Sequence, residues 1–194
     1  MALAQQYIEK ENYTEAEYFE FERMSFGRWE YDNGKIRLMA SGSDDHGTIA
    51  TNIGATLRTA LLPRGCRVYV EGIKVHTGDD VNTFPDVSVV CGPRIYHGGR
   101  TDVIINPLLL VEVLSPSTRD YDQREKFQHY QTIESLQDYL MVEPDKARAM
   151  LYTRREDHWE FYEVNGLESA VLLSSVGVAL ALSDIYALIE FEDE

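Results

Sequence analysis

The chain has 194 residues, of which 44% are hydrophobic and 26% charged, so it can bury a core and does not have the composition of a disordered protein. No apolar run approaches the roughly 20 residues that span a bilayer, and the N-terminus lacks a secretory signal pattern. We therefore expect one domain over residues 1–194, located in the cytoplasm. The formal net charge of −15 argues against tight, non-specific binding of nucleic acid.

The negative charge is unevenly distributed along the chain. Residues 131–194 hold four basic and fourteen acidic side chains, whereas residues 64–130 hold eight basic and nine acidic ones. The middle of the chain is nearly neutral, so a metal-bridged contact with nucleic acid stays open there. Two cysteines, Cys66 and Cys91, lack the spacing of a zinc site, and we expect them to be buried and reduced rather than disulfide-bonded.

A helix and a hairpin are predicted near the N-terminus. Thr14 and Glu17 form a capping-box pattern, which predicts that a helix begins here. Residues 28–31 and 35–39 flank Asn33-Gly34, a pair that favours the type I′ turn of a β-hairpin.

The next segment reads as a helix followed by strands. Apolar residues recur on one helical face over residues 46–62, and Pro63 with Gly65 ends that helix. Four strands are then predicted, at residues 67–71, 73–76, 86–91 and 108–114. The last of these, LLLVEVL, is a near-continuous apolar run, which is typical of a strand buried on both faces.

A polar helix over residues 120–132 separates these strands from a second group. The second group of strands is predicted at residues 138–142, 149–153, 159–164 and 170–173. Asn165-Gly166 favours a second type I′ hairpin, and Ser183 is expected to cap a last helix over residues 184–189. Strands mixed with helices, and hairpins near both ends, predict an α/β fold with a mixed β-sheet.

Glu112 stands where packing alone would place an apolar residue. It interrupts the apolar run at residues 108–114, and an ionised carboxylate in a buried strand is costly unless a cation or strong donors compensate it. An arginine partner at the strand end would satisfy it, and so would a bound metal ion.

Asp86 has a similar setting, between Pro85 and an apolar strand. By itself it reads as a turn-capping residue. Two neighbouring strands that offer carboxylates at matching height also suit Mg²⁺ or Mn²⁺, which prefer oxygen ligands and leave room for water and phosphate. The backbone carbonyl of Val113 is a candidate third ligand.

Pro85-Asp86, the run VEVLSPST at residues 111–118, and the pair Asp122 and Lys126 together resemble the PD-(D/E)XK superfamily of restriction-endonuclease-like proteins. More narrowly, they are similar to a bacterial family of endonuclease-like proteins within it, long described as a domain of unknown function. The similarity runs from about residue 14 to residue 142 and includes the strand QDYLMVEP.

The resemblance implies a restriction-endonuclease-like core, a mixed β-sheet flanked by helices, with metal bound at Asp86 and Glu112. The superfamily pattern places a lysine two residues after Glu112, where this chain has Leu114. In the narrower family a lysine on the following helix takes that role, and Lys126 is the matching residue. Asp122 lies one helical turn earlier, although the two are equally an ordinary exposed i,i+4 pair.

Several other residues are candidates for the same site. The resemblance implies that Glu30 helps to hold the metal or its water, but Glu30 is equally a solvated hairpin residue. His46 is either a phosphate contact or a hydrogen-bonding residue at a helix start. Basic side chains after the motif would face the nucleic-acid backbone or lie on a solvated helix surface; these are Arg119, Arg124 and His129.

The resemblance therefore implies a metal-dependent endonuclease that hydrolyses nucleic-acid phosphodiesters, with DNA as the expected substrate. Because no Ser, Cys or His stands in a nucleophile–base arrangement, water activated by Mg²⁺ or Mn²⁺ is the expected nucleophile. By analogy with enzymes that cut two strands, we expect a homodimer. Two alternatives stay open: an inactive binding or assembly module with the nuclease fold, and a metal-dependent phosphoesterase for small nucleotides.

Overall fold

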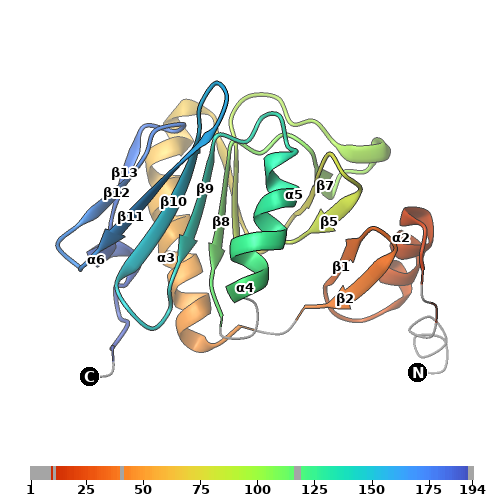
Figure 1. Ribbon diagram of the computed structural model, residues 1–194, viewed down its shortest axis with the longest axis horizontal. Coiled ribbons are helices and arrows are strands. Elements are labelled where there is room, and N and C mark those ends of the chain that lie inside the picture. Colours follow the sequence, from red (N-terminus) through yellow and green to blue (C-terminus); the bar gives the residue numbers. More distant parts are fainter. Residues whose placement is uncertain (1–9, 11, 40–41, 116–118, 192–194) are drawn as a thin grey trace.

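The computed structural model describes residues 10, 12–39, 42–115 and 119–191, arranged around two larger β-sheets that lie side by side (Figure 1). The helical segments are α2 (Glu15–Met24), α3 (Asp44–Leu61), η1 (Leu62–Arg64), η2 (His97–Gly99), α4 (Arg119–Tyr121), η3 (Asp122–Lys126), α5 (Phe127–Gln131) and α6 (Leu182–Ile185). The strands are β1 (Trp29–Asp32), β2 (Lys35–Leu38), β3 (Arg67–Val70), β4 (Lys74–His76), β5 (Val81–Thr83), β6 (Val87–Val90), β7 (Val103–Ile104), β8 (Leu109–Val113), β9 (Asp138–Val142), β10 (Arg148–Arg154), β11 (Trp159–Asn165), β12 (Ala170–Leu173) and β13 (Val178–Ala181).

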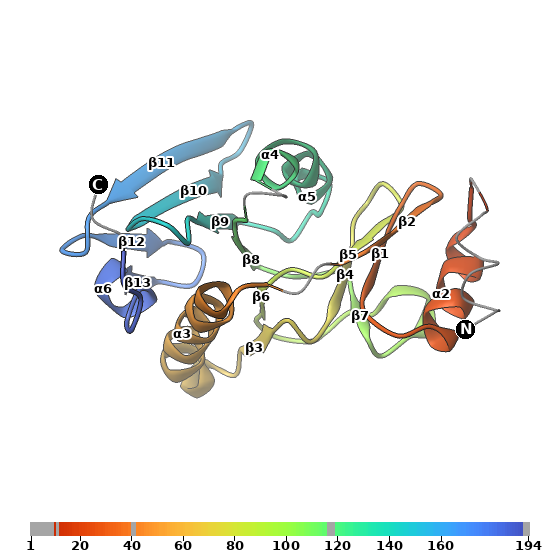
Figure 2. The same cartoon turned by 90° about the horizontal axis from the view of Figure 1, so that it is seen from below.

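A six-stranded sheet forms the centre of the molecule, in the order β11-β10-β9-β8-β6-β3. β8 and β9 run parallel, whereas the other neighbours are antiparallel, so the sheet is mixed. α3 covers one face of this sheet, and α4 with α5 covers the other (Figure 2). β8 and β9 are buried along their whole length, which explains their near-continuous apolar sequence. The expected mixed sheet flanked by helices is confirmed.

α3 packs on the central sheet through one apolar stripe. Ile49, Ile53, Leu57 and Leu61 follow one another at intervals of four residues and are fully buried. Burying each of them contributes roughly 1.5–3 kcal/mol relative to exposure. The helix begins two residues before the predicted start because the Ser43 side chain caps it, accepting a hydrogen bond from the backbone N–H of residue 46 at 3.2 Å.

A five-stranded sheet carries the N-terminal part of the chain, in the order β2-β1-β5-β4-β7. The capping box of Thr14 and Glu17 is present at the start of α2. Asn33 (φ 44°) and Gly34 (φ 97°) have the positive φ angles of the predicted hairpin turn between β1 and β2. β5 and β7 were not predicted, because strands of three and two residues show no alternation to detect.

The two faces of the five-stranded sheet have different neighbours. The register aligns Tyr31, Asn82 and His76 in one row across β1, β5 and β4. Tyr31 stacks on Tyr18 of α2, with ring centroids 5.3 Å apart, so this row faces α2. Because side chains alternate along a strand, Glu30 points to the opposite face, toward the central sheet and its helices.

The helix predicted over residues 120–132 is continuous but not uniform. Between α4 and α5 the chain forms the π-helical turn η3, which is wider than an α-helical turn. Asp122 and Lys126, at the two ends of η3, are both buried. The pair is therefore not an exposed i,i+4 pair on a solvated helix.

Two predictions for the C-terminal region are wrong. Asn165-Gly166 does not join two paired strands, because β11 pairs with β10, and β12 pairs with β13 in a separate two-stranded sheet. The C-terminal hairpins are therefore β10–β11 and β12–β13. Ser183 does not cap the last helix: α6 begins at Leu182, with Ala181 at the N-cap position and no side-chain hydrogen bond there.

The expectation of two free thiols is also wrong, since Cys66 and Cys91 form a disulfide. The antiparallel register of β3 and β6 pairs Arg67 with Val90, and its next position places the two cysteines opposite each other. Their Cα atoms are 4.1 Å apart. The sequence could not reveal this, because the residues are separated by 25 positions and only strand pairing brings them together.

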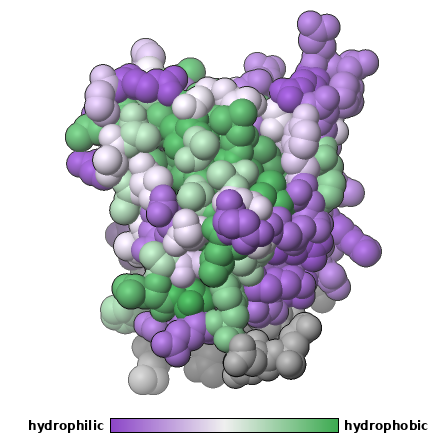
Figure 3. Space-filling view, turned by 90° about the vertical axis from the view of Figure 1, so that its left-hand side faces the viewer, coloured by the Kyte–Doolittle hydropathy of each residue, from purple (hydrophilic) through white to green (hydrophobic). Residues whose placement is uncertain are grey.

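The face formed by β11–β13 and α6 carries a continuous apolar surface (Figure 3). Phe161, Tyr162 and Leu172 are among the large apolar side chains exposed on these strands. In the part of the chain that the structure describes, no helix combines the length and the apolar character needed to cross a membrane.

Candidate active site

The two carboxylates singled out in the sequence come from adjacent strands. β6 and β8 pair antiparallel with Val87 opposite Val111, so the next position of the register places Asp86 opposite Glu112. Cross-strand neighbours on one face have Cβ atoms about 4.5–5.5 Å apart. Both residues are buried, with 7% and 3% of their surfaces exposed. The prediction that these strands are neighbours with carboxylates at matching height is therefore confirmed.

Glu112 is held by side chains of η3 and α5, on the face of the central sheet that α4 and α5 cover. Its Oε1 atom accepts a hydrogen bond from the Tyr130 hydroxyl at 2.7 Å and lies 2.8 Å from Nζ of Lys126. Tyr130 belongs to α5 and is fully buried. Both contacts use Oε1, so they hold the carboxylate in place and leave Oε2 as the atom to consider for a ligand.

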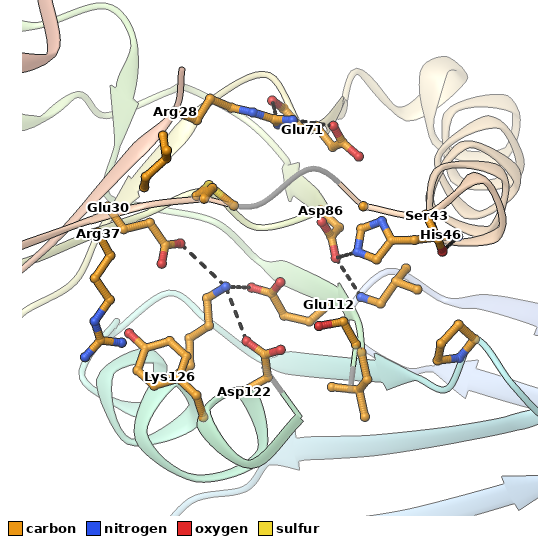
Figure 4. A pocket seen from close by; sticks show the side chains of 18 residues that line it. Arg28, Glu30, Arg37, Ser43, His46, Glu71, Asp86, Glu112, Asp122 and Lys126 are labelled. Carbon is orange, nitrogen blue, oxygen red and sulfur yellow. Dashed lines mark hydrogen bonds and ion pairs between the residues drawn. The ribbon is translucent and has the colours of Figure 1, made fainter. Parts of the chain in front are cut away.

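Lys126 lies at the centre of a cluster of carboxylates. Its Nζ atom is 2.8 Å from Glu112, 3.5 Å from Asp122 and 3.6 Å from Glu30. Glu30 comes from β1 and also accepts a hydrogen bond from the backbone N–H of Phe84 at 3.0 Å. The structure thus brings together Glu30, Glu112, Asp122 and Lys126, and Figure 4 shows their side chains converging from three elements.

Asp86 is held from the other side, by a backbone group and a histidine. Its Oδ2 atom accepts a hydrogen bond from the backbone N–H of Val113 at 2.7 Å and lies 3.2 Å from Nε2 of His46. His46 stands in the first turn of α3 and its side chain reaches the site, where a contact with phosphate stays a prediction. The hydrogen bond to Asp86 raises the pKa of His46, against the opposing effect of burial.

Glu71 and Arg28, like Arg37 of β2, are charged residues of the site that were not predicted. Glu71, which follows β3, offers a carboxylate oxygen within 4.8 Å of ligand atoms of His46 and Asp86. Arg28, before β1, donates to the Glu71 carboxylate at 2.8 Å and to its backbone carbonyl at 2.9 Å. Neither stands out in the sequence, because an acidic residue at a strand end and an arginine before a hairpin are common on protein surfaces.

These residues line one cavity of about 490 Å³. Its charged lining comprises five carboxylates and three permanent cations: Glu30, Glu71, Asp86, Glu112, Asp122, Arg28, Arg37 and Lys126. The cavity is thus two positive charges short of neutrality when His46 is uncharged. Arg37 reaches it from β2 and stacks on the ring of Tyr121 at 4.6 Å.

The buried charges alter one another's ionisation. Burial raises the pKa of Glu112 well above its ordinary value, because the Lys126 ammonium only partly offsets burial and the neighbouring carboxylates. Burial lowers the pKa of Lys126. The carboxylates of Glu112 and Glu30 raise the pKa by more than burial lowers it, so the pKa lies well above its ordinary value. Lys126 therefore stays an ammonium, and the centre lacks the positive charge needed to keep all its carboxylates ionised.

Other residues singled out in the sequence lie outside the cavity. Arg119 pairs with Glu143, and Arg124 is exposed on the helix; neither lines the cavity. His129 pairs with Asp79 at 2.7 Å. Positions 116–118 of the VEVLSPST run lie outside the described residues.

A family model described as "Uma2: Putative restriction endonuclease" matches residues 16–183. The chain belongs to the Uma2 family. Two Synechocystis proteins are similar to it: uncharacterized protein slr1290 is 33% identical over 90% of this chain and 92% of its own, and uncharacterized protein sll1609 is 28% identical over 83% and 92%. The restriction-endonuclease-like family that the sequence motifs resembled is therefore confirmed.

A solved structure supports the fold of this Uma2 chain. It is described as a "putative nuclease belonging to DUF820" from Anabaena variabilis, and it superposes with a TM-score of 0.72 at 20% identity. The match covers 90% of this chain and 98% of that one. At this identity the likeness establishes the shared nuclease fold.

The position at which the superfamily usually has its lysine is occupied by the core residue Leu114 in this Uma2 chain. Leu114 is fully buried in the apolar cluster beneath α5, which includes Phe127 and Tyr130. Leu114 also lines the cavity, but its apolar side chain supplies no charge there. The ammonium enters the site from η3 instead, at Lys126.

Proposed function

We propose that the protein is a divalent-metal-dependent nuclease that hydrolyses phosphodiester bonds of nucleic acid, with DNA as the expected substrate. The observation that carries this proposal is the position of Asp86 opposite Glu112 on adjacent strands, with the Lys126 ammonium 2.8 Å from Glu112. Paired carboxylates and one ammonium that line a cavity of about 490 Å³ match what metal-assisted hydrolysis requires.

The donor set of the cavity fits a hard divalent cation. Asp86 and Glu112 each use one oxygen for the contacts described, and we assign the other oxygens, Oδ1 and Oε2, as ligands together with the carbonyl of Val113. With His46 uncharged, the lining is short of two positive charges, which one Mg²⁺ or Mn²⁺ would supply. A bound divalent ion supplies a Lewis acid that polarises a phosphate oxygen and makes water more acidic.

The protein's own side chains provide orientation and charge. We assign Lys126 to donate hydrogen bonds to the attacking water or to a phosphate oxygen as negative charge develops. Glu30 and Asp122 position its ammonium, at 3.6 and 3.5 Å. Arg37, which lines the cavity, takes the role of phosphate contact that the sequence had given to Arg119 and Arg124.

Cleavage in the presence of Mg²⁺ or Mn²⁺ is the first expected result. Supercoiled plasmid, single- and double-stranded oligonucleotides and RNA are incubated with the protein, and products are followed on gels. We expect strand scission that stops when EDTA removes the metal and resumes when Mn²⁺ is added back.

The alternatives correspond to other outcomes of the same experiment. Hydrolysis of nucleotides or bis(p-nitrophenyl) phosphate without scission of any polymer would identify a small-molecule phosphoesterase, which the net charge of −15 would suit. Absence of both activities, together with no Mn²⁺ binding in calorimetry, would identify an inactive binding or assembly module.

We also propose that two copies associate through the apolar face at β11. β11 is the edge strand of the central sheet, and Phe161 and Tyr162, which point to opposite sides of the sheet along this edge, are 50% and 45% exposed. An unpaired edge with apolar side chains favours pairing with a second copy across a two-fold axis.

Light scattering after gel filtration tests the dimer. The unmodified protein is expected to elute as a dimer and Phe161→Lys as a monomer. Phe26→Lys, at a residue that is 98% exposed outside this face, is the matched control and should remain dimeric. An unmodified protein that is monomeric at micromolar concentration would rule out this interface.

A further inference from the structure

A second group of metal-binding residue types lies outside the candidate cavity. Glu15 is the first residue of α2, His76 the last of β4, and His97 the first of η2. One ligand atom from each lies within 4.8 Å of the other two. His76 belongs to the row of the five-stranded sheet that faces α2, whereas Glu30 points to the opposite face, so the sheet separates this group from the candidate active site.

The three side chains already converge on one carboxylate. Nε2 of His97 is 2.9 Å from Oε2 of Glu15, and Nδ1 of His76 is 3.2 Å from Oε1. Asn82 lies beneath them, fully buried, and its Nδ2 donates to Oε1 of Glu15 at 2.8 Å. A buried amide that fixes a carboxylate between two imidazoles is the kind of supporting contact that metal ligands have.

The two imidazole rings are stacked, with centroids 3.6 Å apart and planes 19° from parallel. Two protonated rings at this distance would repel each other, so the pair cannot supply two positive charges to Glu15. Burial and the neighbouring His97 lower the pKa of His76, and neutral imidazole is the form that binds metal. The nitrogens of His76 and His97 thus face the Glu15 carboxylate without two positive charges between them.

We propose that Glu15, His76 and His97 bind a divalent transition-metal ion of the Zn²⁺ class. Two imidazole nitrogens and one carboxylate oxygen, with a fourth position left for water, suit Zn²⁺ or Co²⁺ and not the all-oxygen preference of Mg²⁺. On binding, the two rings tilt out of their stacked arrangement so that each directs the nitrogen that now faces Glu15 at the ion, and each keeps its proton on the other nitrogen. Nδ1 of His76 then gives up its present contact with Oδ1 of Asn82, at 3.3 Å. Any proton on the coordinating nitrogen is released to solvent.

Such an ion would join three segments that are distant in the sequence. α2 packs on the five-stranded sheet through aromatic contacts, and η2 lies in the connection between β6 and β7. An ion held by Glu15, His76 and His97 would fasten both segments to β4. The site is independent of the proposed nuclease activity, and neither proposal requires the other.

Cobalt binding to the Asp86→Asn variant tests the site, because this change weakens the candidate active-site metal centre and leaves the second group intact. We expect one Co²⁺ per chain, with the visible d–d absorption of an imidazole-ligated ion. Adding His97→Ala should weaken Co²⁺ binding by about 100-fold or more. Adding His158→Ala, at an exposed histidine of the β10–β11 connection, should leave it unchanged.

Zn²⁺ provides a second measurement on the same proteins. At about 100 times its dissociation constant it should raise the melting temperature of Asp86→Asn by about 5 °C or more, and the rise should be lost with His97→Ala. Glu15→Gln, which preserves the size of the side chain and an oxygen acceptor, should show the same loss and replaces His97→Ala if that variant does not fold. Equal Co²⁺ binding with and without these changes, or none in Asp86→Asn, would overturn the proposal. The nuclease proposal is tested separately, by cleavage with the unmodified chain.

Discussion

Replacement of Lys126 by methionine is expected to reduce cleavage by about 10²–10³-fold and to lower the free energy of unfolding by about 3–5 kcal/mol. Methionine preserves the length of the side chain but removes the ammonium that neutralises Glu112, Asp122 and Glu30. Glu112 is then a buried carboxylate that, among the described residues, keeps the hydrogen bond from the Tyr130 hydroxyl but has no cation beside it. Urea denaturation and initial cleavage rates measure the two effects.

A double replacement separates the structural and chemical roles of Lys126. Adding Glu112→Gln to Lys126→Met removes the unpaired charge, so we expect about 1–3 kcal/mol of the lost stability to return, whereas cleavage is not restored. Arg124→Met, at an exposed residue of the same π-helical turn, is the matched control and should change stability by no more than about 0.5 kcal/mol. Lys126→Met protein that cuts at the normal rate would remove Lys126 from the mechanism.

Asp86→Asn is expected to abolish detectable cleavage and to weaken Mn²⁺ binding on the order of 100-fold or more. The asparagine oxygen can still accept the hydrogen bond from Val113, so the free energy of unfolding should change by only about 1 kcal/mol. The change therefore removes a charged ligand and preserves the packing around it. Isothermal titration with Mn²⁺ and plasmid cleavage measure the two losses.

The control for Asp86→Asn is the same exchange at Asp120, an exposed residue of α4. Asp120→Asn should bind Mn²⁺ and cut as the unmodified protein does. Mn²⁺ affinity that is unchanged in Asp86→Asn would show that the ion binds elsewhere, and the assignment of Asp86 and Glu112 as ligands would have to be abandoned.

The central features of the site could be predicted because they break a local pattern. Glu112 is detectable as a charged residue inside an apolar strand, and Asn33-Gly34 as a turn between two strands. Asn165-Gly166 has the same local pattern as Asn33-Gly34 but a different outcome, because partner choice between strands is decided by packing far along the chain. Local turn chemistry can favour a turn without determining which strands pair.

The pairing of β3 with β6 and the geometry of the helix that carries Lys126 could not be predicted. The disulfide between Cys66 and Cys91 and the approach of Glu71 to Asp86 both depend on how β3 pairs with β6. The π-helical turn buries Lys126, whereas ideal α-helical spacing allowed an exposed pair with Asp122. Such features depend on contacts between distant segments, for which one sequence carries no periodic signal.

The route by which the ammonium enters the site bears on how related sequences can be recognised. Only the end of the lysine side chain has to reach the carboxylates, so the residue that carries it is free to move from a strand to a helix if the strand position becomes part of the core, as at Leu114. A search that requires Glu-x-Lys would discard this chain. A search for an apolar residue two positions after the glutamate, with Asp-x-x-x-Lys in the helix that follows, would find proteins that carry the lysine on the helix instead of the strand.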